Sequence, residues 1–220
     1  MYMIVVGAGS IGTSLIDIAV SEKNNVVVID SKPERARDLR DKYDITILSG
    51  NATSAETLRE AGAERADALI VTTSDDAVNL MVVSIAAELS IPSIVSVVND
   101  KDHADFFRKL GANVMENPED VVANYLYNAV KRPNVKDFAL LPQGAEIFRL
   151  EVGEQSPLVN RSIAESRQRE TIPETMRILA VSRDGEQFLP GEEAVIQEGD
   201  VLTVFSLDRV NDEMVEKLTG

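Results

Sequence analysis

The chain has 220 residues, of which 44% are hydrophobic, and a formal net charge of −15 at pH 7. This length suits one large domain or two modest ones with a real hydrophobic core. The acidic balance disfavours nucleic acid and anionic lipid as partners, because no basic stripe is present to neutralise phosphates. Cysteine is absent, which excludes disulfides, thiolate metal sites and cysteine nucleophiles. No apolar stretch approaches the ~20 residues of a membrane span, and no signal-peptide pattern is present, so we expect a cytoplasmic protein without direct membrane insertion.

Six short apolar runs rich in valine and isoleucine divide the first half of the chain. Continuous runs of this kind are typical of parallel strands that are buried on both faces. Helical patterns lie between them, which predicts an α/β fold, a Rossmann-like doubly wound parallel sheet covered on both sides. The predicted strands are 3–6, 26–29, 45–48, 68–71, 93–98 and 113–115.

The predicted helices of this half differ in their apolar patterns. Ser31 is a plausible cap for a second helix, with Pro33 in its first turn. Residues 75–89 are apolar nearly all round and should be deeply packed, with Ser74 as a candidate cap. The first helix places four apolar residues on one face: Ile11, Leu15, Ile18 and Ala19.

A further helix is predicted to begin at Asn117-Pro118 and to end at Lys131-Arg132-Pro133. Because it follows the last predicted strand, its apolar side needs a partner. Two alternatives stay open, packing on its own sheet and contact with a second copy of the chain. The apolar side carries Val121, Val122, Tyr125, Leu126 and Ala129.

After Asn134 the hydrophobic period changes from 3.6 towards 2, which indicates a separate small α+β domain. Three strands are predicted, over 147–152, 178–182 and 201–205, and a final helix carries Val210, Met214, Val215 and Leu218. We therefore expect two domains, residues 1–133 and residues 134–220.

Gly7-Ala8-Gly9-Ser10-Ile11-Gly12 lies between a predicted strand and a predicted helix, and Asp30 closes the next strand. In this setting the glycines permit a tight turn, close approach of a pyrophosphate and close packing of helix on strand. The amides of Ser10 and Ile11 would point at phosphate oxygens. Asp30 would accept hydrogen bonds from ribose hydroxyls, and its charge favours NAD or an adenine ribonucleotide over NADP.

Two polar loops follow the third and fourth predicted strands, at the edge where such sheets bind ligands. Asn51 could read an adenine edge, and Thr72 and Thr73 could line the far side of the cleft. The alternative is that both loops only cap helices, with Thr53 or Ser54 in the first of them.

Catalytic residues do not accompany the nucleotide motif. The single histidine, His103, stands at a predicted helix start, where it is more often a capping or surface residue. The carboxylates of Glu192-Glu193 and Glu198-Gly199-Asp200 are read as solvated turns rather than as a cation site. A non-enzymatic protein is therefore expected. The alternatives are a small NAD-dependent oxidoreductase, which needs an acid or base beside the nicotinamide, and a redox-sensing regulator of another partner.

Several motifs together resemble the RCK/KTN nucleotide-binding domains of the TrkA type, which regulate potassium transport. They are Gly7-x-Gly9-x-x-Gly12, Asp30 with Arg35, Gly50-Asn51-Ala52-Thr53, and Thr72-Thr73-Ser74-Asp75-Asp76-Ala77-Val78-Asn79. The tail from Ser156-Pro157-Leu158 to Glu198-Gly199-Asp200-Val201-Leu202 is similar to the associated C-terminal RCK domain, so the resemblance covers essentially the whole chain.

This resemblance implies a regulatory subunit that binds ATP, ADP, NAD or NADH. The resemblance also implies a homo-oligomer, a dimer or ring, beneath a membrane potassium-transporter subunit of the Trk type, with nucleotide exchange gating that partner. The implied location is cytoplasmic and peripheral to the membrane. The implied binding residues are Gly7, Gly9, Ser10 and Ile11 for phosphates, Asp30, Ser31 and Arg35 for ribose, and Asn51, Ala52, Thr72 and Thr73 for adenine and the cleft.

Two residues depart from the family pattern. Asn51 replaces a common aspartate, and Val97 stands where many relatives have an arginine that reaches a phosphate. The second change leaves open which nucleotide binds, with Lys101 as a partial substitute. Whether the C-terminal domain binds a second ligand also stays open.

Overall fold

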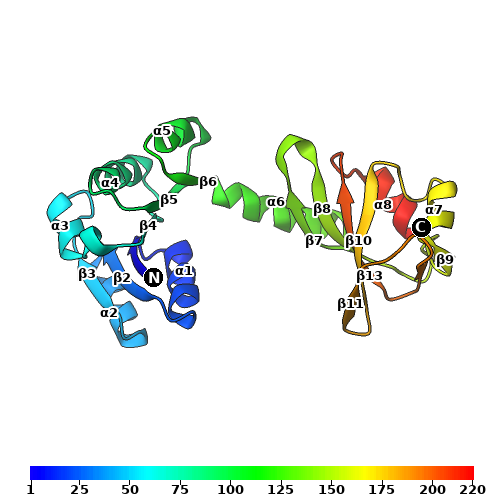
Figure 1. The fold of residues 1–220 in the computed structure, drawn as a ribbon, viewed down its shortest axis with the longest axis horizontal. Coiled ribbons are helices and arrows are strands. Elements are labelled where there is room, and N and C mark those ends of the chain that lie inside the picture. The colour runs from blue at the N-terminus through cyan, green and yellow to red at the C-terminus, as the bar shows by residue number, and fades with distance from the viewer. The chain divides into compact units, whose positions relative to one another are not determined.

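The computed structural model describes residues 1–220, except for the side chain of Pro142. The chain forms two compact units, Met1–Asp120 and Val121–Gly220, which are drawn in Figure 1. Among the described residues, no helix has both the length and the apolar character needed to cross a membrane.

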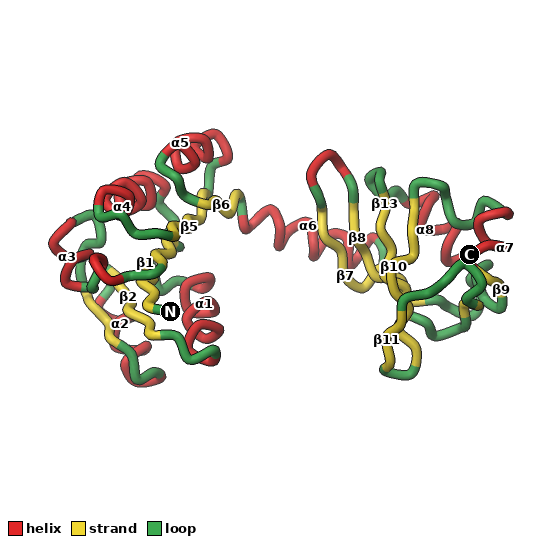
Figure 2. The backbone as a smooth tube through the Cα atoms, viewed as in Figure 1, coloured by secondary structure: helices red, strands yellow, loops and turns green.

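Unit 1 is built on a parallel sheet with strand order β3-β2-β1-β4-β5-β6. All six predicted strands are confirmed, with ends that differ by one residue at most. Figure 2 shows them in yellow among the red helices. The strands are β1 (Tyr2–Val6), β2 (Asn25–Asp30), β3 (Thr46–Ser49), β4 (Ala68–Val71), β5 (Ser93–Val98) and β6 (Asn113–Glu116). The helices are α1 (Ser10–Ser21), α2 (Pro33–Lys42), α3 (Ala55–Glu60), α4 (Asp76–Glu88) and α5 (Ala104–Lys109), and short 3₁₀ turns lie at Ala63–Arg65 and Lys101–His103. A further helix, α6 (Pro118–Lys131), begins in unit 1 and continues into unit 2.

Alternate strand residues build two cores, one on each face of this sheet. Ile4 and Val6 of β1 point to the core that contains α3, α4 and α5, and Phe107 of α5 is fully buried there. Val5, between them, points to the core that contains α1 and α2. The doubly wound α/β prediction is therefore confirmed, and burial on both faces explains the unbroken valine and isoleucine runs.

The predicted face of α1 is wrong in two of its four residues. Ile11 and Ile18 are 42% and 57% exposed. Ala19 of the predicted face is buried, together with Gly12 and Ile16, and Leu15 packs against the same core. A Cβ on Gly12 would lie 1.9 Å from the carbonyl oxygen of Gly7. The helix therefore packs directly against the loop after β1 at this glycine. This contact fixes the rotation of α1 and turns Ile11 and Ile18 outward.

Two other packing predictions need correction. Ser31 does not cap α2, since Lys32 holds the N-cap position and no side chain caps that helix. The helix α4 is packed on one side only, because Met81 is 52% exposed while Val82 and Val83 are fully buried.

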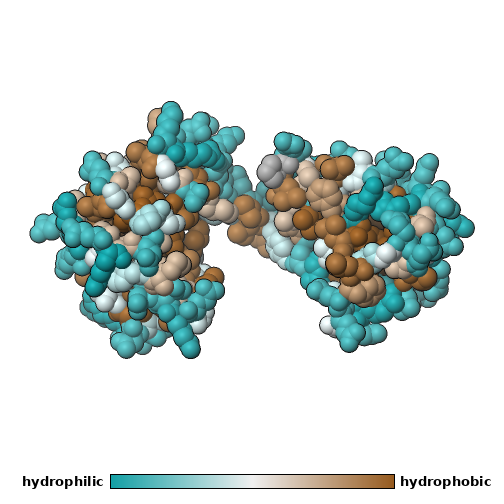
Figure 3. Space-filling model, in the orientation of Figure 1, coloured by the Kyte–Doolittle hydropathy of each residue, from teal (hydrophilic) through white to brown (hydrophobic). Residues whose placement is uncertain are grey.

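None of the residues of α6 is buried, so the structure does not support packing of this helix on its own sheet. Val121, Val122, Leu126 and Val130 are between 54% and 85% exposed. In Figure 3 the surface at the place of α6 is correspondingly apolar. Tyr125 stacks on Phe138, with ring centroids 6.0 Å apart, and both residues belong to unit 2.

Unit 2 holds an antiparallel sheet with strand order β11-β10-β13-β8-β7 and a small β12-β9 pair. Phe148 and Leu150 of β8 and Leu202 of β13 lie in its core with Leu218 of the final helix, which confirms the α+β prediction. The sequence patterns did not predict β7, β9, β11, β12 or α7. The elements are β7 (Val135–Leu140), β8 (Glu146–Glu151), β9 (Arg161–Ser162), β10 (Met176–Arg183), β11 (Glu186–Phe188), β12 (Val195–Ile196), β13 (Val201–Ser206), α7 (Ile163–Gln168), α8 (Asp212–Thr219) and a 3₁₀ turn at Pro142–Gly144.

Candidate functional site

A cleft of about 460 Å³ lies at the carboxyl ends of the unit 1 strands. The strand order reverses between β1 and β4, and open α/β sheets bind ligands at such a switch point. Two walls therefore face each other. The β1–β3 wall consists of Val6, Gly7, Gly9, Ser10, Ile11, Ile29, Asp30, Ser31, Lys32, Arg35, Gly50, Asn51 and Ala52, and the β4–β6 wall consists of Thr72, Thr73, Ser74, Asp75, Val78, Val97, Asn99, Pro118 and Glu119.

The structure brings eleven of the twelve predicted site residues to this cleft. The exception is Gly12, which does not line it and instead packs against Gly7 and Thr72. Lys101, the proposed substitute for the missing arginine, is not among the described lining residues either, whereas Val97 is.

The N-terminus of α1 opens into the β1–β3 wall without a cap. The N-cap residue is Gly9, which has no side chain to accept a hydrogen bond from the first amides of α1. These amides also have no partner inside the helix. Gly7 has φ of +97°, a conformation that glycine adopts readily, and it turns the chain into the helix. Unpaired amides at the positive end of a helix dipole form an anion site.

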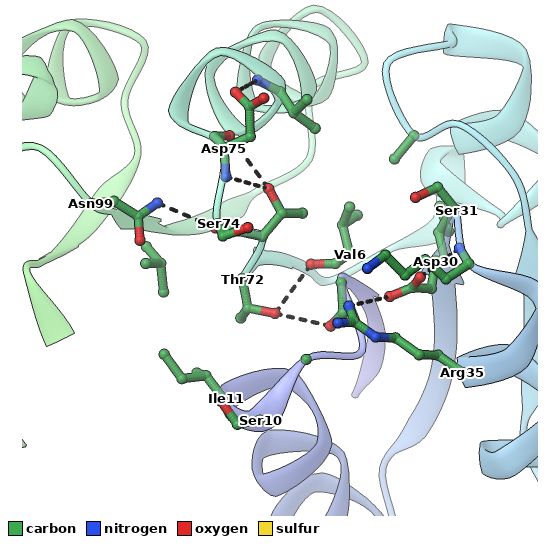
Figure 4. A pocket seen from close by; sticks show the side chains of 18 of the residues that line it. Val6, Ser10, Ile11, Asp30, Ser31, Arg35, Thr72, Ser74, Asp75 and Asn99 are labelled. Carbon is green, nitrogen blue, oxygen red and sulfur yellow. Dashed lines mark hydrogen bonds and ion pairs between the residues drawn. The ribbon is translucent and has the colours of Figure 1, made fainter. Parts of the chain in front are cut away.

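Asp30 ties this wall together. The side chain is buried, and its carboxylate accepts hydrogen bonds from the Ala8 amide at 2.6 Å and the Lys32 amide at 2.8 Å. A guanidinium nitrogen of Arg35 lies 3.7 Å from the same carboxylate (Figure 4). Since each carboxylate oxygen has two acceptor sites, Asp30 retains acceptor capacity towards the cleft.

Thr72 joins the two walls. Its hydroxyl donates to the carbonyl oxygens of Gly7 at 2.9 Å and Val6 at 3.2 Å, as Figure 4 shows. It is therefore a support of the glycine loop as well as a lining residue. Asn51 is similarly engaged, because its side-chain oxygen accepts from the amide and the hydroxyl of Thr53.

The β4–β6 wall is held by side chains that the sequence did not single out. Asn79 is fully buried, and its amide donates to the carbonyl oxygens of Thr73 at 3.0 Å and Val97 at 3.1 Å. Its side-chain oxygen accepts from the Thr73 hydroxyl at 2.5 Å. Asp75, and not Ser74, caps α4, accepting from the amides of Ala77 and Val78.

Asp76 fastens the loop after β5 to the start of α4. Its carboxylate accepts from the Asn99 amide and side chain, both at 2.8 Å, and from the Asp100 amide at 2.9 Å, and it lies 2.9 Å from His103 Nδ1. Burial alone would raise the pKa of Asp76, but the hydrogen bonds from Asn99, His103 and Asp100 outweigh it and lower that pKa. The hydrogen bond to Asp76 raises the pKa of His103 above its ordinary 6.5.

Unit 2 has a cavity of about 350 Å³ between α6, β7 and β8 and the loop before α8. Its charged groups are paired with one another, as shown by the contacts of Lys131 with Asp212 at 3.0 Å and of Arg132 with Glu146 at 3.9 Å.

The prediction from the sequence is wrong for one carboxylate of unit 2. Asp200, expected in a solvated turn, is fully buried and forms a bidentate pair with Arg183 at 2.7 and 2.8 Å.

Comparisons with known proteins assign the family. The TrkA-N domain family matches residues 3–118, which is more than half of the chain, and the TrkA-C domain family matches residues 147–214. The chain belongs to the TrkA-N family.

The wider TrkA resemblance extends over the whole chain. It is 28% identical to the Trk system potassium uptake protein TrkA homolog of Methanothermobacter thermautotrophicus, and the match covers 100% of both chains. This confirms the resemblance to TrkA-type proteins that the motifs predicted.

Solved structures of the GsuK channel have a similar fold. The GsuK channel bound to NAD has a TM-score of 0.65 at 22% identity, covering 93% of this chain and 37% of that one, which supports the fold alone. The GsuK bound to ADP has a TM-score of 0.51 at 29% identity over 60% of this chain and 34% of that one.

Proposed function

We propose that this chain is a regulatory subunit of potassium transport that binds an adenine nucleotide in the unit 1 cleft. The observation that carries the proposal is the uncapped N-terminus of α1, which opens beside the buried Asp30 at the switch point of the sheet. The similar GsuK bound to ADP supports the ligand class. The relative with matching length is named a potassium uptake protein, which supports the process.

The residues of the cleft fit such a ligand, whether it is NAD, NADH, ATP or ADP. The amides of Ser10 and Ile11, with Gly9 beside them, would hold phosphate oxygens. Asp30 would accept from ribose hydroxyls, and its negative charge opposes a 2′-phosphate. Gly12 allows α1 to pack closely against the glycine loop, because any side chain at this position would meet the carbonyl oxygen of Gly7.

The cleft is suited to binding rather than to turnover. Its described lining residues include no histidine, cysteine or tyrosine, and His103 is engaged with Asp76 outside it. Hydrogen bonds within the protein, which fix the shape of the walls, already engage the side chains of Thr72, Thr73 and Asn51. We therefore propose a sensor that catalyses no reaction.

The proposed mechanism is differential affinity. Loops from β1–β3 and from β4–β6 would both contact one nucleotide, so a ligand that binds one arrangement of the walls better shifts the population towards it. The shift can be no larger than that difference in affinity.

Exposed apolar side chains on α6 support a homo-oligomer, a dimer or ring, through which the shift is passed on. The partner we propose is a membrane potassium-transporter subunit of the Trk type, with this chain on the cytoplasmic face. We assign nucleotide binding to residues 1–133 and the C-terminal RCK domain to residues 134–220.

Potassium uptake tests this function directly. Cells that retain a Trk membrane subunit but lack their own TrkA are supplied with this chain or with its Asp30→Ala variant. We expect the wild type to restore uptake and the variant to restore much less. Light scattering of the purified chain should give a mass above the monomer at micromolar concentration. A strict monomer would overturn the proposal. Potassium uptake that neither the wild type nor the Asp30→Ala variant raises would overturn it as well.

A further inference from the structure

The cavity of unit 2, of about 350 Å³, has the size of a small-molecule pocket, for which the usual range is about 300–1,000 Å³. All of its lining residues belong to unit 2. They come from α6, β7, β8 and the loop before α8 (Figure 1). The cavity is therefore large enough for a small metabolite, and it shares no lining residue with the cleft of unit 1.

Glu146 brings a buried carboxylate to this cavity. Its side chain is 4% exposed. The cations within 4 Å of the carboxylate are Arg132, at 3.9 Å, and Arg209, at 3.8 Å, and both distances exceed that of a hydrogen bond. Within the part of the chain that the structure describes, no group donates a hydrogen bond to Glu146. A buried carboxylate without donors is costly, so a molecule inside the cavity has to supply them.

Arg132 presents the complementary group to the same cavity. Its Nε is buried and forms no hydrogen bond, and the nearest carboxylate oxygen of Asp212 lies 3.5 Å away. Another nitrogen of this guanidinium donates to the carbonyl oxygen of Val210, which holds the side chain in the cavity wall. The cavity therefore contains a donor that needs an acceptor beside an acceptor that needs a donor.

The lining charges favour a ligand that carries both signs. The cations are Lys131, Arg132 and Arg209, and the carboxylates are Glu146 and Asp212. A simple anion would be repelled by the carboxylates, and a simple cation by the three basic groups. A zwitterion can direct its cationic N–H donors towards the carboxylate of Glu146 and its own carboxylate towards the guanidinium groups, where charge-assisted hydrogen bonds are strong.

The rest of the wall includes an apolar surface. Phe138 and Leu140 of β7 line the cavity with Val210. Leu140 is half-exposed, so a ligand that covers it with an apolar group gains from the burial of both surfaces. A zwitterion with an apolar side chain therefore fits the wall better than one with a polar side chain.

We propose that the cavity of unit 2 binds a free α-amino acid with an apolar side chain. The ammonium group of the ligand donates to Glu146, and its carboxylate accepts from Arg132 and Arg209. Its side chain lies against Phe138 and Leu140. The ligand thereby joins the end of α6 to β8 and to the loop before α8. This site is independent of the nucleotide site proposed for unit 1.

Isothermal titration of the full chain with L-leucine tests the proposal. Two analogues of the same shape are compared with it: 4-methylpentanoate, which lacks the ammonium group, and leucinamide, which lacks the carboxylate. Each analogue loses one set of charge-assisted hydrogen bonds, so we expect both to bind about tenfold more weakly than L-leucine. Saturating ADP should leave the affinity for L-leucine unchanged, because ADP is expected in the other unit.

Two variants locate the binding. Glu146→Gln should weaken L-leucine about tenfold and should not weaken 4-methylpentanoate, which has no ammonium group to lose. Arg209→Gln changes a side chain that is 72% exposed, so it keeps the fold and serves if Glu146→Gln does not fold; it should weaken L-leucine about fivefold. Arg37→Gln, the same change at an exposed position of α2, should have no effect.

The contrary outcomes are equally definite. Absence of saturable L-leucine binding at tens of millimolar would show that the cavity holds solvent only, and would overturn the proposal. Equal affinity for the three compounds, displacement of L-leucine by ADP, or wild-type affinity in both Glu146→Gln and Arg209→Gln would overturn it as well. The proposed function of unit 1 depends on nucleotide binding and is not affected by any of these results.

Discussion

The two walls of the cleft are built in opposite ways. The β1–β3 wall leaves backbone donors free, because α1 starts without a cap and its first amides have no intrahelical partner. In the β4–β6 wall, the side chains of Thr73 and Asn99 are already paired, with Asn79 and Asp76 behind them. The free groups indicate where a ligand is bound, and the paired groups indicate where a shape is held.

This difference teaches how one cleft can both bind and respond. We expect the binding energy to come from the free backbone donors of the β1–β3 wall, whereas hydrogen bonds hold the shape of the β4–β6 wall. Thr72 is the direct link between them, since its hydroxyl donates to the Gly7 carbonyl. Changes in the two walls should therefore have separable effects.

The largest effect is expected at the tightest contact of the β1–β3 wall. Gly12→Ala would place a Cβ 1.9 Å from the Gly7 oxygen, which forces α1 away from the loop and costs about 3 kcal/mol or more of unfolding free energy. Chemical denaturation measures this loss. Gly153→Ala is the control, since its Cβ meets nothing within 4 Å. Equal stability of the two variants would refute the close-contact explanation.

Asp30→Asn should have the next largest effect. The amide cannot accept as the carboxylate does from both Ala8 and Lys32, and a buried donor left unpaired costs about 1–3 kcal/mol. ADP affinity should fall about tenfold or more, as calorimetry would show. Asp41→Asn, the same change at an exposed position of α2, should leave the free energy of unfolding and the affinity for ADP unchanged. Unaltered ADP binding in Asp30→Asn would remove Asp30 from the site.

Thr72→Val tests the link between the walls. The near-isosteric change deletes the hydrogen bonds to Gly7 and Val6, so we expect a loss of about 1 kcal/mol in stability. The affinity for ADP should fall by a few-fold. Thr72→Ser, which keeps the hydroxyl, should retain most of the wild-type stability and most of the affinity for ADP. If the serine variant behaves like the valine variant, packing of the methyl group matters and the hydrogen bonds do not.

How far the sequence predicts the cleft depends on the range of the interactions. The strands, the glycine loop and Asp30 follow from local spacing, and all were predicted. The exposure of Ile11 and Ile18 on α1 was not, because the contact of Gly12 with Gly7 sets the rotation of the helix, and hydrophobic periodicity does not register a missing side chain. The Asp75 cap was assigned to its neighbour Ser74, an error of one residue that capping preferences alone cannot resolve.

Longer-range pairs escaped prediction altogether. Asp76 meets His103 from 27 positions away, and Asp200 meets Arg183 across antiparallel strands. Nothing in the local pattern of either residue distinguishes it from a solvated turn. The twelve predicted binding residues and the boundary at 133/134 stay predictions.

The smallest effect belongs to the β4–β6 wall and depends on pH. Since the folded-state pKa of His103 is raised above 6.5, its pair with Asp76 stabilises the fold fully below that pH. The contribution is lost as pH rises through the raised value. Melting temperatures of the wild type and of His103→Gln should differ more at pH 6 than at pH 9. A difference that stays constant across this range would show that the pair is not charge-assisted.

The central claim is that the uncapped N-terminus of α1 and Asp30 together form a nucleotide site. Isothermal titration of the full chain with ADP tests it most directly. We expect saturable binding with one ADP per chain, weakened about tenfold or more by Asp30→Asn and unaffected by Asp41→Asn. Absence of heat and of thermal stabilisation with ADP at millimolar concentration would contradict the claim.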